Sequence, residues 1–362
     1  MTRIGVIGAG QLGQMLGIAG QRMGLEFIFL DPADDPPAAR VGSVLKYPFD
    51  GDEGLALLAA ATEIITYEFE NVPVAAIERI ADGVSVYPPA QALLYAQDRV
   101  AEKTLFEFLG IPVPGFRPVN SSSELLKAIE EIGLPLVLKT RRLGYDGKGQ
   151  FVIRNASEID AAIAALGVKD LIAEQWVRFD REISAIGVRS RSGQIVHYPL
   201  TGNEHESGIL RISRAPAILP KLQETAQSYV TTLLEHLDYV GVLALELFVT
   251  GDRLLANEFA PRVHNSGHWT IEGAKTSQFE NHLRAILDMP LGETAMCGYA
   301  GMLNLIGNLP VDRNPFESHP CHLHDYGKVP RPGRKLGHAT VVTTTAEERD
   351  ATVLRLSELL ST

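Results

Sequence analysis

The sequence contains only two cysteines, Cys297 and Cys321, among its 362 residues. Two cysteines cannot form a disulfide framework, and we expect both to be free thiols in a reducing compartment. No apolar run approaches the ~20 residues that a membrane span requires, and the first residues lead directly into a strand instead of a signal peptide. We therefore expect a soluble, cytoplasmic protein that has no membrane partner.

Basic residues are also in the minority, because 33 Lys and Arg stand against 44 Asp and Glu, a net charge of -11. Domains that bind nucleic acid carry basic stripes, and this sequence has none, so we expect no nucleic-acid partner. Any phosphate must instead be bound by a local basic cluster. The hydrophobic content of 45% and charged content of 21% are typical of a globular enzyme, and the length suits two or three domains.

The N-terminal region contains a glycine motif between a strand and a helix. Residues 3–7 predict a strand, residues 8–13 read GAGQLG, and a second strand over residues 26–30 ends at Asp31. This pattern satisfies the dinucleotide fingerprint and predicts a Rossmann-like domain. An NAD-dependent dehydrogenase is one interpretation. A loop that holds a different phosphate is the other, because any helix N-terminus favours an anion.

Two acidic residues follow the next predicted strand, residues 63–67. Glu68 and Glu70 lie just beyond its carboxyl end, where open α/β sheets bind their ligands. The alternative is that these carboxylates cap the helix expected to begin near Val72. The sequence leaves both interpretations open.

Residues 134–153, LPLVLKTRRLGYDGKGQFVI, predict two strands joined by a glycine-rich loop. The first strand ends near Lys139, and the loop over residues 144–149 carries three glycines and Lys148. The loop is longer than a tight hairpin needs, and glycine lets backbone amides approach a ligand closely. Two lysines so placed suit a polyphosphate. The alternative is a surface hairpin whose lysines are solvated.

A second predicted strand, residues 170–177, ends in the letters EQWV. Backbone groups of residues 174–177 could contact the edge of a purine while apolar side chains cover its face. Farther along, Glu182 could bind ribose hydroxyls or be an ordinary surface carboxylate. His205, in a polar segment, could contact a ligand or be solvated. Arg99, on a helix expected over residues 90–109, would by itself be assigned to a solvated face.

Two glutamates face each other in a predicted hairpin near the middle of the chain. Glu246 lies within the apolar run of residues 242–249, and Glu258 follows the turn. A three-residue loop, residues 251–253, sets the two glutamates opposite each other with β-carbons ~5 Å apart. An even-numbered loop would place them on different faces. Because an unpaired buried charge is costly and a hard divalent cation relieves the repulsion, the pattern favours a magnesium site.

The segment from residue 326 to 338 is unusually basic for so acidic a chain. It contains Lys328, Arg331, Arg334, Lys335 and His338. Such a cluster predicts a monophosphate site. A solvated basic turn is the alternative.

Taken in chain order, these motifs resemble the ATP-grasp superfamily, and within it the enzymes of purine biosynthesis that carboxylate an aminoimidazole ribonucleotide. The matching segments include YDGKGQ, NEFAPRVHNSGHWT and RKLGHAT, whereas GAGQLG alone is not specific. The resemblance covers nearly the whole chain. One departure is Leu143, where a doubled-glycine loop is expected.

The resemblance implies an α/β and α+β fold in three parts. These are a Rossmann-like N-terminal domain over residues 1–98, central ATP-grasp domains over residues 99–295 and a small C-terminal β-rich subdomain over residues 296–362. Within the ATP-grasp part it implies a flap lobe, about 110–176, and a metal lobe, about 177–295. The C-terminal subdomain would hold the phosphate of the acceptor.

The resemblance also implies ATP and Mg²⁺ as cofactors, with magnesium held by Glu246 and Glu258. The residues that would bind the nucleotide are Arg99, Lys139, Gly144, Tyr145, Asp146, Gly147, Lys148, Gly149, Gln150, Glu174, Gln175, Trp176, Val177, Glu182, His205, Asn257 and Glu258. Those that would bind the acceptor are Gln11, Leu12, Glu68, Glu70, Tyr145, Asp146, Asn265, Lys328, Arg334 and Lys335. The catalytic candidates are Lys139, Asp146, Lys148, Arg262 and Asn265.

The reaction implied is the ATP-dependent carboxylation of 5-aminoimidazole ribonucleotide with bicarbonate, through carboxyphosphate, in de novo purine (IMP) biosynthesis. A homodimer is the family expectation. Three alternatives stay open from the sequence: another ATP-grasp ligase that acts on a phosphoribosyl amine, an NAD-dependent dehydrogenase, and a non-catalytic nucleotide sensor.

Overall fold

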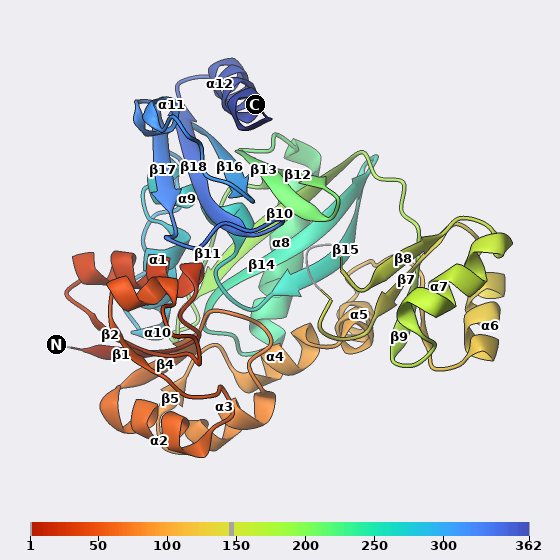
Figure 1. Cartoon of the computed structure of the whole chain (residues 1–362), viewed down its shortest axis with the longest axis horizontal. Helices are drawn as coiled ribbons and strands as arrows, with labels where there is room; N and C mark the ends of the chain where they lie inside the picture. The colour runs from red at the N-terminus through yellow and green to blue at the C-terminus, as the bar shows by residue number, and fades with distance from the viewer. Residues whose placement is uncertain (1, 145–147, 362) are drawn as a thin grey trace.

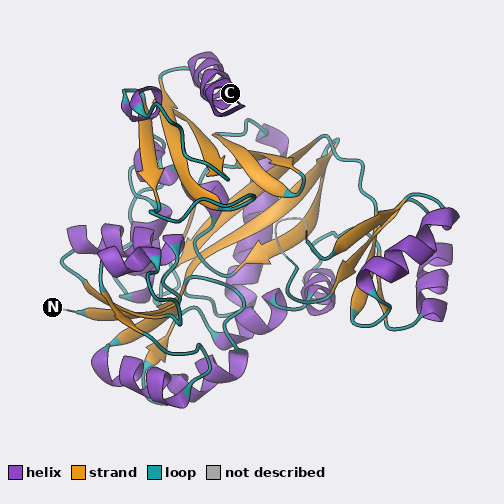
Figure 2. Ribbon diagram, viewed as in Figure 1, coloured by secondary structure: helices purple, strands orange, loops and turns teal. Residues whose placement is uncertain are grey.

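The computed structural model describes residues 2–144 and 148–361, which form three sheets with helices packed around them (Figures 1 and 2). The predicted site residues Tyr145, Asp146 and Gly147 lie outside the described residues. Within the described ranges, no helix combines the length and apolar character needed to cross a bilayer. Cys297 is an exposed free thiol and Cys321 a buried one.

The N-terminal sheet has five parallel strands in the order β3-β2-β1-β4-β5. Its strands and helices are β1 (Arg3–Ile7), α1 (Gln11–Arg22), β2 (Glu26–Leu30), η1 (Pro37–Arg40), β3 (Ser43–Leu45), α2 (Asp52–Ala61), β4 (Ile64–Tyr67), α3 (Val74–Ala81) and β5 (Ser85–Val86). The strand order reverses between β1 and β4, so the loops that follow these two strands meet at one edge. Open α/β sheets bind ligands at such a switch point.

The helical stretch expected over residues 90–109 is two helices, α4 (Ala90–Ala96) and α5 (Arg99–Phe108). The break falls at Asp98, whose side chain accepts hydrogen bonds from the amides of Val100 (3.0 Å) and Ala101 (3.4 Å). Asp is a strong N-cap residue because its carboxylate satisfies amides that have no partner in the first turn. The prediction of one continuous helix overlooked this cap.

The flap lobe is a four-stranded antiparallel sheet in the order β6-β9-β7-β8, at the far right of Figure 1. Its elements are β6 (Phe116–Val119), α6 (Ser122–Ile132), β7 (Leu136–Thr140), β8 (Gln150–Ile153), η2 (Ala156–Glu158), α7 (Ile159–Leu166) and β9 (Leu171–Gln175). The predicted strand–loop–strand of residues 134–153 is therefore present as β7 and β8.

The remaining strands form one large sheet in the order β15-β14-β10-β12-β13-β16-β18-β17, with β11 paired to β10. Its elements are β10 (Arg181–Arg189), β11 (Ile195–His197), β12 (Thr201–Glu206), β13 (Ile209–Ala215), α8 (Pro220–His236), β14 (Gly241–Thr250), β15 (Arg253–Ala260), η3 (Asn265–Gly267), α9 (Thr270–Gly273), α10 (Gln278–Ile286), β16 (Tyr299–Ile306), α11 (Asn314–Glu317), β17 (Cys321–Asp325), β18 (Lys335–Thr343) and α12 (Ala346–Ser361). The C-terminal strands continue the sheet of the metal lobe through the pairing of β13 with β16. The proposed boundary at residues 295/296 therefore divides one continuous sheet.

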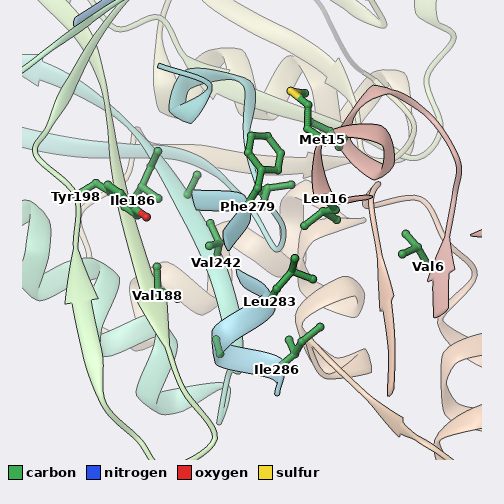
Figure 3. Packing of buried hydrophobic residues seen from close by; sticks show 14 of the residues in the cluster. Val6, Met15, Leu16, Ile186, Val188, Tyr198, Val242, Phe279, Leu283 and Ile286 are labelled. Carbon is green, nitrogen blue, oxygen red and sulfur yellow. The ribbon is translucent and has the colours of Figure 1, made fainter. Parts of the chain in front are cut away.

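A shared apolar core fixes the N-terminal domain against the large sheet. Met15 and Leu16 of α1 belong to the same buried cluster as Phe279 and Leu283 of α10 (Figure 3). Burying each such side chain contributes ~1.5–3 kcal/mol. This packing holds the loops at the carboxyl end of the N-terminal sheet in a constant position relative to the strands of the metal lobe.

Candidate functional site

A cavity of about 550 Å³ opens where the N-terminal domain, the flap lobe and the large sheet meet. Most of the predicted site residues line it, although they come from all three units. Those that line it are Gln11, Leu12, Glu68, Glu70, Arg99, Lys139, Gly144, Lys148, Gln150, Glu174, Gln175, Trp176, Val177, Glu182, His205, Glu246, Asn257, Glu258, Arg262, Asn265 and Lys335. Of the predicted site residues that the structure describes, Gly149, Lys328 and Arg334 are not among the lining residues.

The glycine loop of residues 8–13 is occupied by carboxylates of its own domain. Glu68 accepts hydrogen bonds from the amides of Gly10 and Gly13, the latter at 2.7 Å. Asp31, the acid of the dinucleotide fingerprint, accepts from the amide of Ala9 at 2.9 Å. The amides that would bind a pyrophosphate are therefore already satisfied, and a second anion would be repelled by Glu68. The dinucleotide interpretation is wrong for this physical reason.

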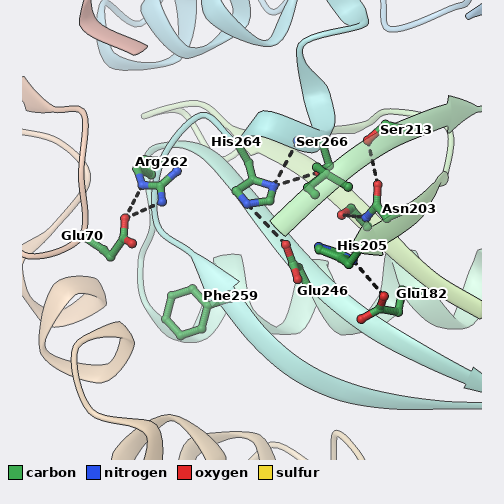
Figure 4. A network of polar contacts seen from close by, with 12 residues as sticks. Glu70, Glu182, Asn203, His205, Ser213, Glu246, Phe259, Arg262, His264 and Ser266 are labelled. Carbon is green, nitrogen blue, oxygen red and sulfur yellow. Dashed lines mark hydrogen bonds and ion pairs between the residues drawn. The ribbon is translucent and has the colours of Figure 1, made fainter. Parts of the chain in front are cut away.

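Glu70 points toward the large sheet and pairs with Arg262 (Figure 4). Although burial opposes ionisation, the Arg262 guanidinium holds the pKa of the Glu70 carboxyl below its ordinary value. The pair joins the loop after β4 to the segment after β15 at the wall of the cavity. The alternative that Glu68 and Glu70 cap the following helix is wrong. The N-cap of α3 is Pro73, and no side chain forms a capping hydrogen bond there.

At the flap lobe, Lys139 lies at the end of β7 and its ammonium is 3.0 Å from Glu174 Oε2. The ammonium of Lys103 lies 3.7 Å from the same oxygen. Burial disfavours the charge of Glu174, yet the two lysines lower its pKa to about 2. The Glu174 side chain thus faces the lysines, while its backbone is in the β9 ladder opposite Val137. The carboxylate of Glu174 is therefore occupied by the two lysines.

Arg99 binds the base of the flap loop. Its guanidinium donates to the carbonyls of Thr140 (3.1 Å) and Gly144 (2.8 Å). A β-carbon at Gly144 would lie 3.2 Å from the guanidinium nitrogens of Arg99 and 3.0 Å from the carbonyl oxygen of Lys148. Glycine is therefore needed there for close packing. Leu143, which departs from the expected glycine, has a φ of 62°, a left-handed conformation that is costly for a branched side chain.

The segment after β9 supplies an apolar wall. Trp176, Val177 and Phe179 line the cavity, and Phe179 stacks on Phe248 of β14 with ring centroids 4.9 Å apart. On the same side, His205 Nδ1 lies 2.8 Å from Glu182 Oε2 (Figure 4). An aromatic and aliphatic wall beside a polar pair fits a purine and its ribose. Neither Phe179 nor Phe248 was predicted as a site residue.

Glu246 of β14 lies directly opposite Glu258 of β15, as predicted, but the predicted loop is wrong. The turn leaves Thr250 paired with Arg253, so it contains two residues, not three. A two-residue turn alone would put the glutamates on opposite faces. The register shifts between Glu246 and Leu247, where a β-bulge restores the pairing. A bulge adds one residue to one strand and so moves the following side chains to the other face.

The glutamate pair has the chemistry of an incomplete metal site. Burial and the carboxylate of Glu258 raise the pKa of Glu246 to about 7. His264 Nε2 lies 3.3 Å from Glu246 Oε1, and burial keeps the pKa of this imidazole well below its ordinary value. Within the described residues no set of three or more His, Cys, Asp or Glu side chains could hold a metal. Two carboxylates whose remaining partners are phosphate oxygens nevertheless fit Mg²⁺.

One side-chain amide on the cavity wall, that of Asn265, is without a hydrogen-bond partner among the described residues. Both Nδ2 and Oδ1 of Asn265 are buried and form no hydrogen bond within the described residues. Buried polar atoms are rarely left unpaired unless they bind water or a ligand. Asn265 lies at the start of η3, beside Arg262 and His264 on the same wall. That Asn265 contacts a substrate stays a prediction.

The basic segment meets the N-terminal domain at Gln11. The ammonium of Lys328 is hydrogen-bonded to Gln11 Oε1 and lies 5.8 Å from the centre of the Tyr326 ring. Burial and the neighbouring Arg334 lower the pKa of Lys328 to about 8. Lys335 begins β18 and lines the cavity, whereas Arg334 donates to the carbonyl of Val329 (3.0 Å). Lys328 and Arg334 bind other parts of the chain and are not among the residues that line the cavity.

Glu102, Lys103 and His264 were not among the predicted site residues. Lys103 is 1% exposed and Glu102 2% exposed, and both side chains bind the backbone of β15. A signal was available, because Lys103 follows Arg99 by one helical turn and Glu102 precedes the buried Leu105 and Phe106 by the helical spacing. Charged residues on the buried face of a helix require partners.

Three domain families match the chain: residues 1–97 match the ribonucleotide synthetase preATP-grasp domain, residues 104–279 the ATP-grasp domain, and residues 300–352 the phosphoribosylaminoimidazole carboxylase C-terminal domain. The N5-carboxyaminoimidazole ribonucleotide synthase of Pseudomonas aeruginosa is 50% identical over 339 residues, 94% of each chain. The matches confirm the predicted superfamily and fold class.

Solved structures agree. The crystal structure of N5-carboxyaminoimidazole ribonucleotide synthetase from Thermus thermophilus has a TM-score of 0.95 and 49% identity, covering 99% of each chain. That of the Aspergillus clavatus N5-carboxyaminoimidazole synthase in complex with ADP and 5-aminoimidazole ribonucleotide has a TM-score of 0.91 and 31% identity, covering 99% of this chain and 98% of that chain. The chain therefore belongs to the N5-carboxyaminoimidazole ribonucleotide synthetase family of ATP-grasp enzymes.

Proposed function

We propose that this enzyme uses ATP to join bicarbonate to the exocyclic amine of 5-aminoimidazole ribonucleotide in purine biosynthesis. The products are N5-carboxyaminoimidazole ribonucleotide, ADP and phosphate. The observation that carries this proposal is a single cavity that is lined by lysines of the flap lobe, by the facing pair Glu246 and Glu258 and by Lys335 of the basic segment. The Aspergillus relative, solved with ADP and the aminoimidazole ribonucleotide together, supports a site for both ligands in one fold.

The nucleotide site that we propose lies between the flap lobe and the large sheet. Trp176, Val177 and the Phe179–Phe248 stack would cover the adenine, and the Glu182–His205 pair would bind the ribose. Basic groups near the flap loop would bind the phosphates. These are Arg99, Lys139 and Lys148, with Gly144, Gly149 and Gln150 supplying backbone close to the ligand.

Magnesium would be held by Glu246 and Glu258, with Asn257 beside them. A bound magnesium ion would supply positive charge that neutralises the phosphate oxygens of ATP. The raised pKa of Glu246 supports this assignment, because the two carboxylates repel each other in the absence of a cation. The chain's own contribution is to hold Glu246 and Glu258 opposite each other on one face of the β14–β15 hairpin.

The acceptor site that we propose lies between the glycine loop of the N-terminal domain and the basic segment. Gln11, Leu12 and Asn265 would contact the aminoimidazole ribonucleotide directly, while Lys335 would bind its 5′-phosphate. Lys328 and Arg334 would add positive charge near Lys335. Glu68 would act by shaping the glycine loop, because its carboxylate is already bound to Gly10 and Gly13.

The reaction proceeds in two steps. A bicarbonate oxygen attacks the γ-phosphorus of ATP, and the bond to the β-phosphate oxygen breaks to give ADP and carboxyphosphate. The amine nitrogen then attacks the carbon of carboxyphosphate, or of carbon dioxide released from it in place, and phosphate leaves. Arg262 and Lys139 would stabilise the negative charge that develops. The amine must lose one proton, and Asp146, outside the described residues, remains our candidate for the base.

Four further features belong to the proposal. We propose that the domains divide at residues 98/99 and 295/296, that bicarbonate is the carbon donor, that the enzyme is a homodimer, and that it acts in the cytoplasm. The family matches over residues 1–97, 104–279 and 300–352 support the three-part division.

Phosphate release tests the proposed function. With magnesium-ATP and bicarbonate, release should rise strongly when 5-aminoimidazole ribonucleotide is added, and ¹³C from labelled bicarbonate should appear in the product. Other phosphoribosyl amines serve as the control for a different ATP-grasp ligase. Release that is unchanged by the ribonucleotide, or faster with another amine, would contradict the proposal.

A further inference from the structure

Strand β15 carries Glu258 at the edge of the large sheet. One side of β15 pairs with β14, whereas among the described residues no strand pairs with its outer side. The backbone groups on that outer side must be satisfied by other parts of the chain. This is also the stretch where the β-bulge moves Glu258 onto the face of Glu246.

The carbonyl of Pro112 accepts from the amide of Ala256 at 2.7 Å, and two consecutive residues of helix α5 bind three further backbone groups. The ammonium of Lys103 donates to the carbonyls of Ala256 (3.1 Å) and Asn257 (2.7 Å). Glu102 Oε1 accepts from the amide of Phe259 at 2.7 Å. The three backbone groups bracket Glu258 on both sides.

These contacts fall where the bulge disturbs the ladder. A bulge leaves one residue without its regular ladder partners, so the outer contacts decide which register is stable. If β15 relaxed to the register of its two-residue turn, Asn257 would lie opposite Glu246 and Glu258 would turn to the other face. The buried ammonium of Lys103 would then lose at least one carbonyl, which is costly for a charge in an apolar setting.

We propose that Glu102 and Lys103 are positioning residues that hold β15 in its bulged register and so keep the carboxylate of Glu258 beside that of Glu246. Lys103 touches no atom that the reaction changes; it acts through the backbone of the metal-binding strand. This inference rests on the metal site proposed above.

The same ammonium also reaches the flap lobe. Lys103 lies 3.7 Å from Glu174 Oε2, and that oxygen binds Lys139 at 3.0 Å. A single buried side chain thus links the strand that carries Glu258 to the lysine at the end of β7. Loss of Lys103 should therefore have its larger effect on the metal site and a smaller effect on the position of Lys139.

Binding of Mn²⁺ and ADP without turnover tests the proposal. Electron paramagnetic resonance measures free Mn²⁺, and Lys103→Met should weaken its binding to the enzyme–ADP complex by roughly tenfold or more, as expected when a group supporting a metal ligand is removed. The affinity for 5-aminoimidazole ribonucleotide, measured by calorimetry, should change less than about twofold. Glu107→Gln, on the exposed face of the same helix, is the matched control and should change neither.

A second pair of variants keeps the test decisive if Lys103→Met does not fold. Glu102→Gln retains an oxygen that accepts from the Phe259 amide, so its Mn²⁺ affinity should stay within about threefold, whereas Glu102→Leu removes the acceptor and should lose about tenfold. Equal losses in both variants would overturn the proposal, because charge rather than the backbone contact would then matter. Equal retention would overturn it as well.

The double variant separates this inference from the metal assignment. If Lys103 acts through Glu258, then adding Lys103→Met to Glu258→Gln should weaken Mn²⁺ binding no further. Additive losses would overturn the positioning role while leaving the metal pair intact. If Glu258→Gln alone binds Mn²⁺ normally, both the metal pair and the positioning role are wrong.

Discussion

Two glycine loops of this enzyme follow a buried strand, yet their surroundings differ in charge. The loop of residues 8–13 in the N-terminal domain is bound by its own acids, Glu68 and Asp31. The described part of the flap loop, Gly144 and residues 148–149, lies among cations, with Arg99 bonded to the Gly144 carbonyl. Only the second loop is suited to a polyphosphate.

This difference shows that a glycine motif predicts a backbone conformation but does not identify the ligand. Glycine permits close approach and left-handed conformations in both loops. The charge of the side chains that face the amides decides which ligand is bound. In the N-terminal loop, an internal carboxylate takes the place that a pyrophosphate occupies in a dinucleotide site. In our proposal this loop helps to shape the acceptor site.

The largest expected effect lies at the flap and metal end. Glu258→Gln should lower kcat on the order of 100-fold or more, because it removes charge that organises the phosphoryl transfer, while the protein still folds. Steady-state kinetics at saturating magnesium measures this. Near-normal turnover would show that the wrong carboxylates are assigned to magnesium.

At the acceptor end, Lys335→Ala should raise KM for 5-aminoimidazole ribonucleotide about tenfold, since a charge-assisted hydrogen bond contributes ~1.5–3 kcal/mol where partly desolvated. KM for ATP should hardly move. The exposed Lys169 provides a control substitution of the same type. An equal rise in both Michaelis constants would mean that the basic segment serves the nucleotide or the fold.

The pH dependence of acceptor binding should reflect Lys328, whose pKa is about 8. Its ammonium is charged below that pH and neutral above it. Affinity for the phosphate should therefore fall as pH rises, by about twofold at pH 8 and at most about tenfold at pH 9. Calorimetry across this range measures the effect. In Lys328→Arg the fall should disappear, because a guanidinium stays protonated; an unchanged profile would exclude Lys328 as its cause.

The smallest expected effect on catalysis comes from the N-terminal loop. Glu68→Ala leaves the amides of Gly10 and Gly13 unpaired, and buried groups of this kind cost ~1–3 kcal/mol of stability each. Thermal unfolding should show this loss. Fluorescence titration should detect no NADH binding in the wild type. An unchanged unfolding temperature, or NADH binding by the wild type, would contradict the claim that Glu68 occupies the amides of this loop.

Most strands could be predicted because their signals are local, whereas most candidate site residues were assigned through the family resemblance. The strand–loop–strand around Lys139 and the basic segment around Lys335 follow from apolar runs, glycines and charge. The register of Glu246 and Glu258 was predicted from a loop length that is wrong. The bulge that corrects it depends on Lys103, which lies far away in the sequence, so no local pattern could reveal it.

The group that binds the amides of the N-terminal loop could not be predicted, for a related reason. The motif GAGQLG looks the same whether a cofactor or Glu68 binds its amides. Glu68 follows strand β4, and the parallel pairing of β1 with β4 brings it to the glycine loop. The break at Asp98 is different, because an Asp followed by a new amphipathic stretch is a readable cap signal.

A crystal of this enzyme with ADP, Mn²⁺ and 5-aminoimidazole ribonucleotide tests the central claim most directly. Anomalous scattering locates Mn²⁺ independently of the protein atoms. We predict a peak between Glu246 and Glu258, adenine beside Trp176 and Phe179, and the ribonucleotide between residues 8–13 and Lys335. Adenine seated at the glycine loop of residues 8–13, or Mn²⁺ away from both glutamates, would contradict the account.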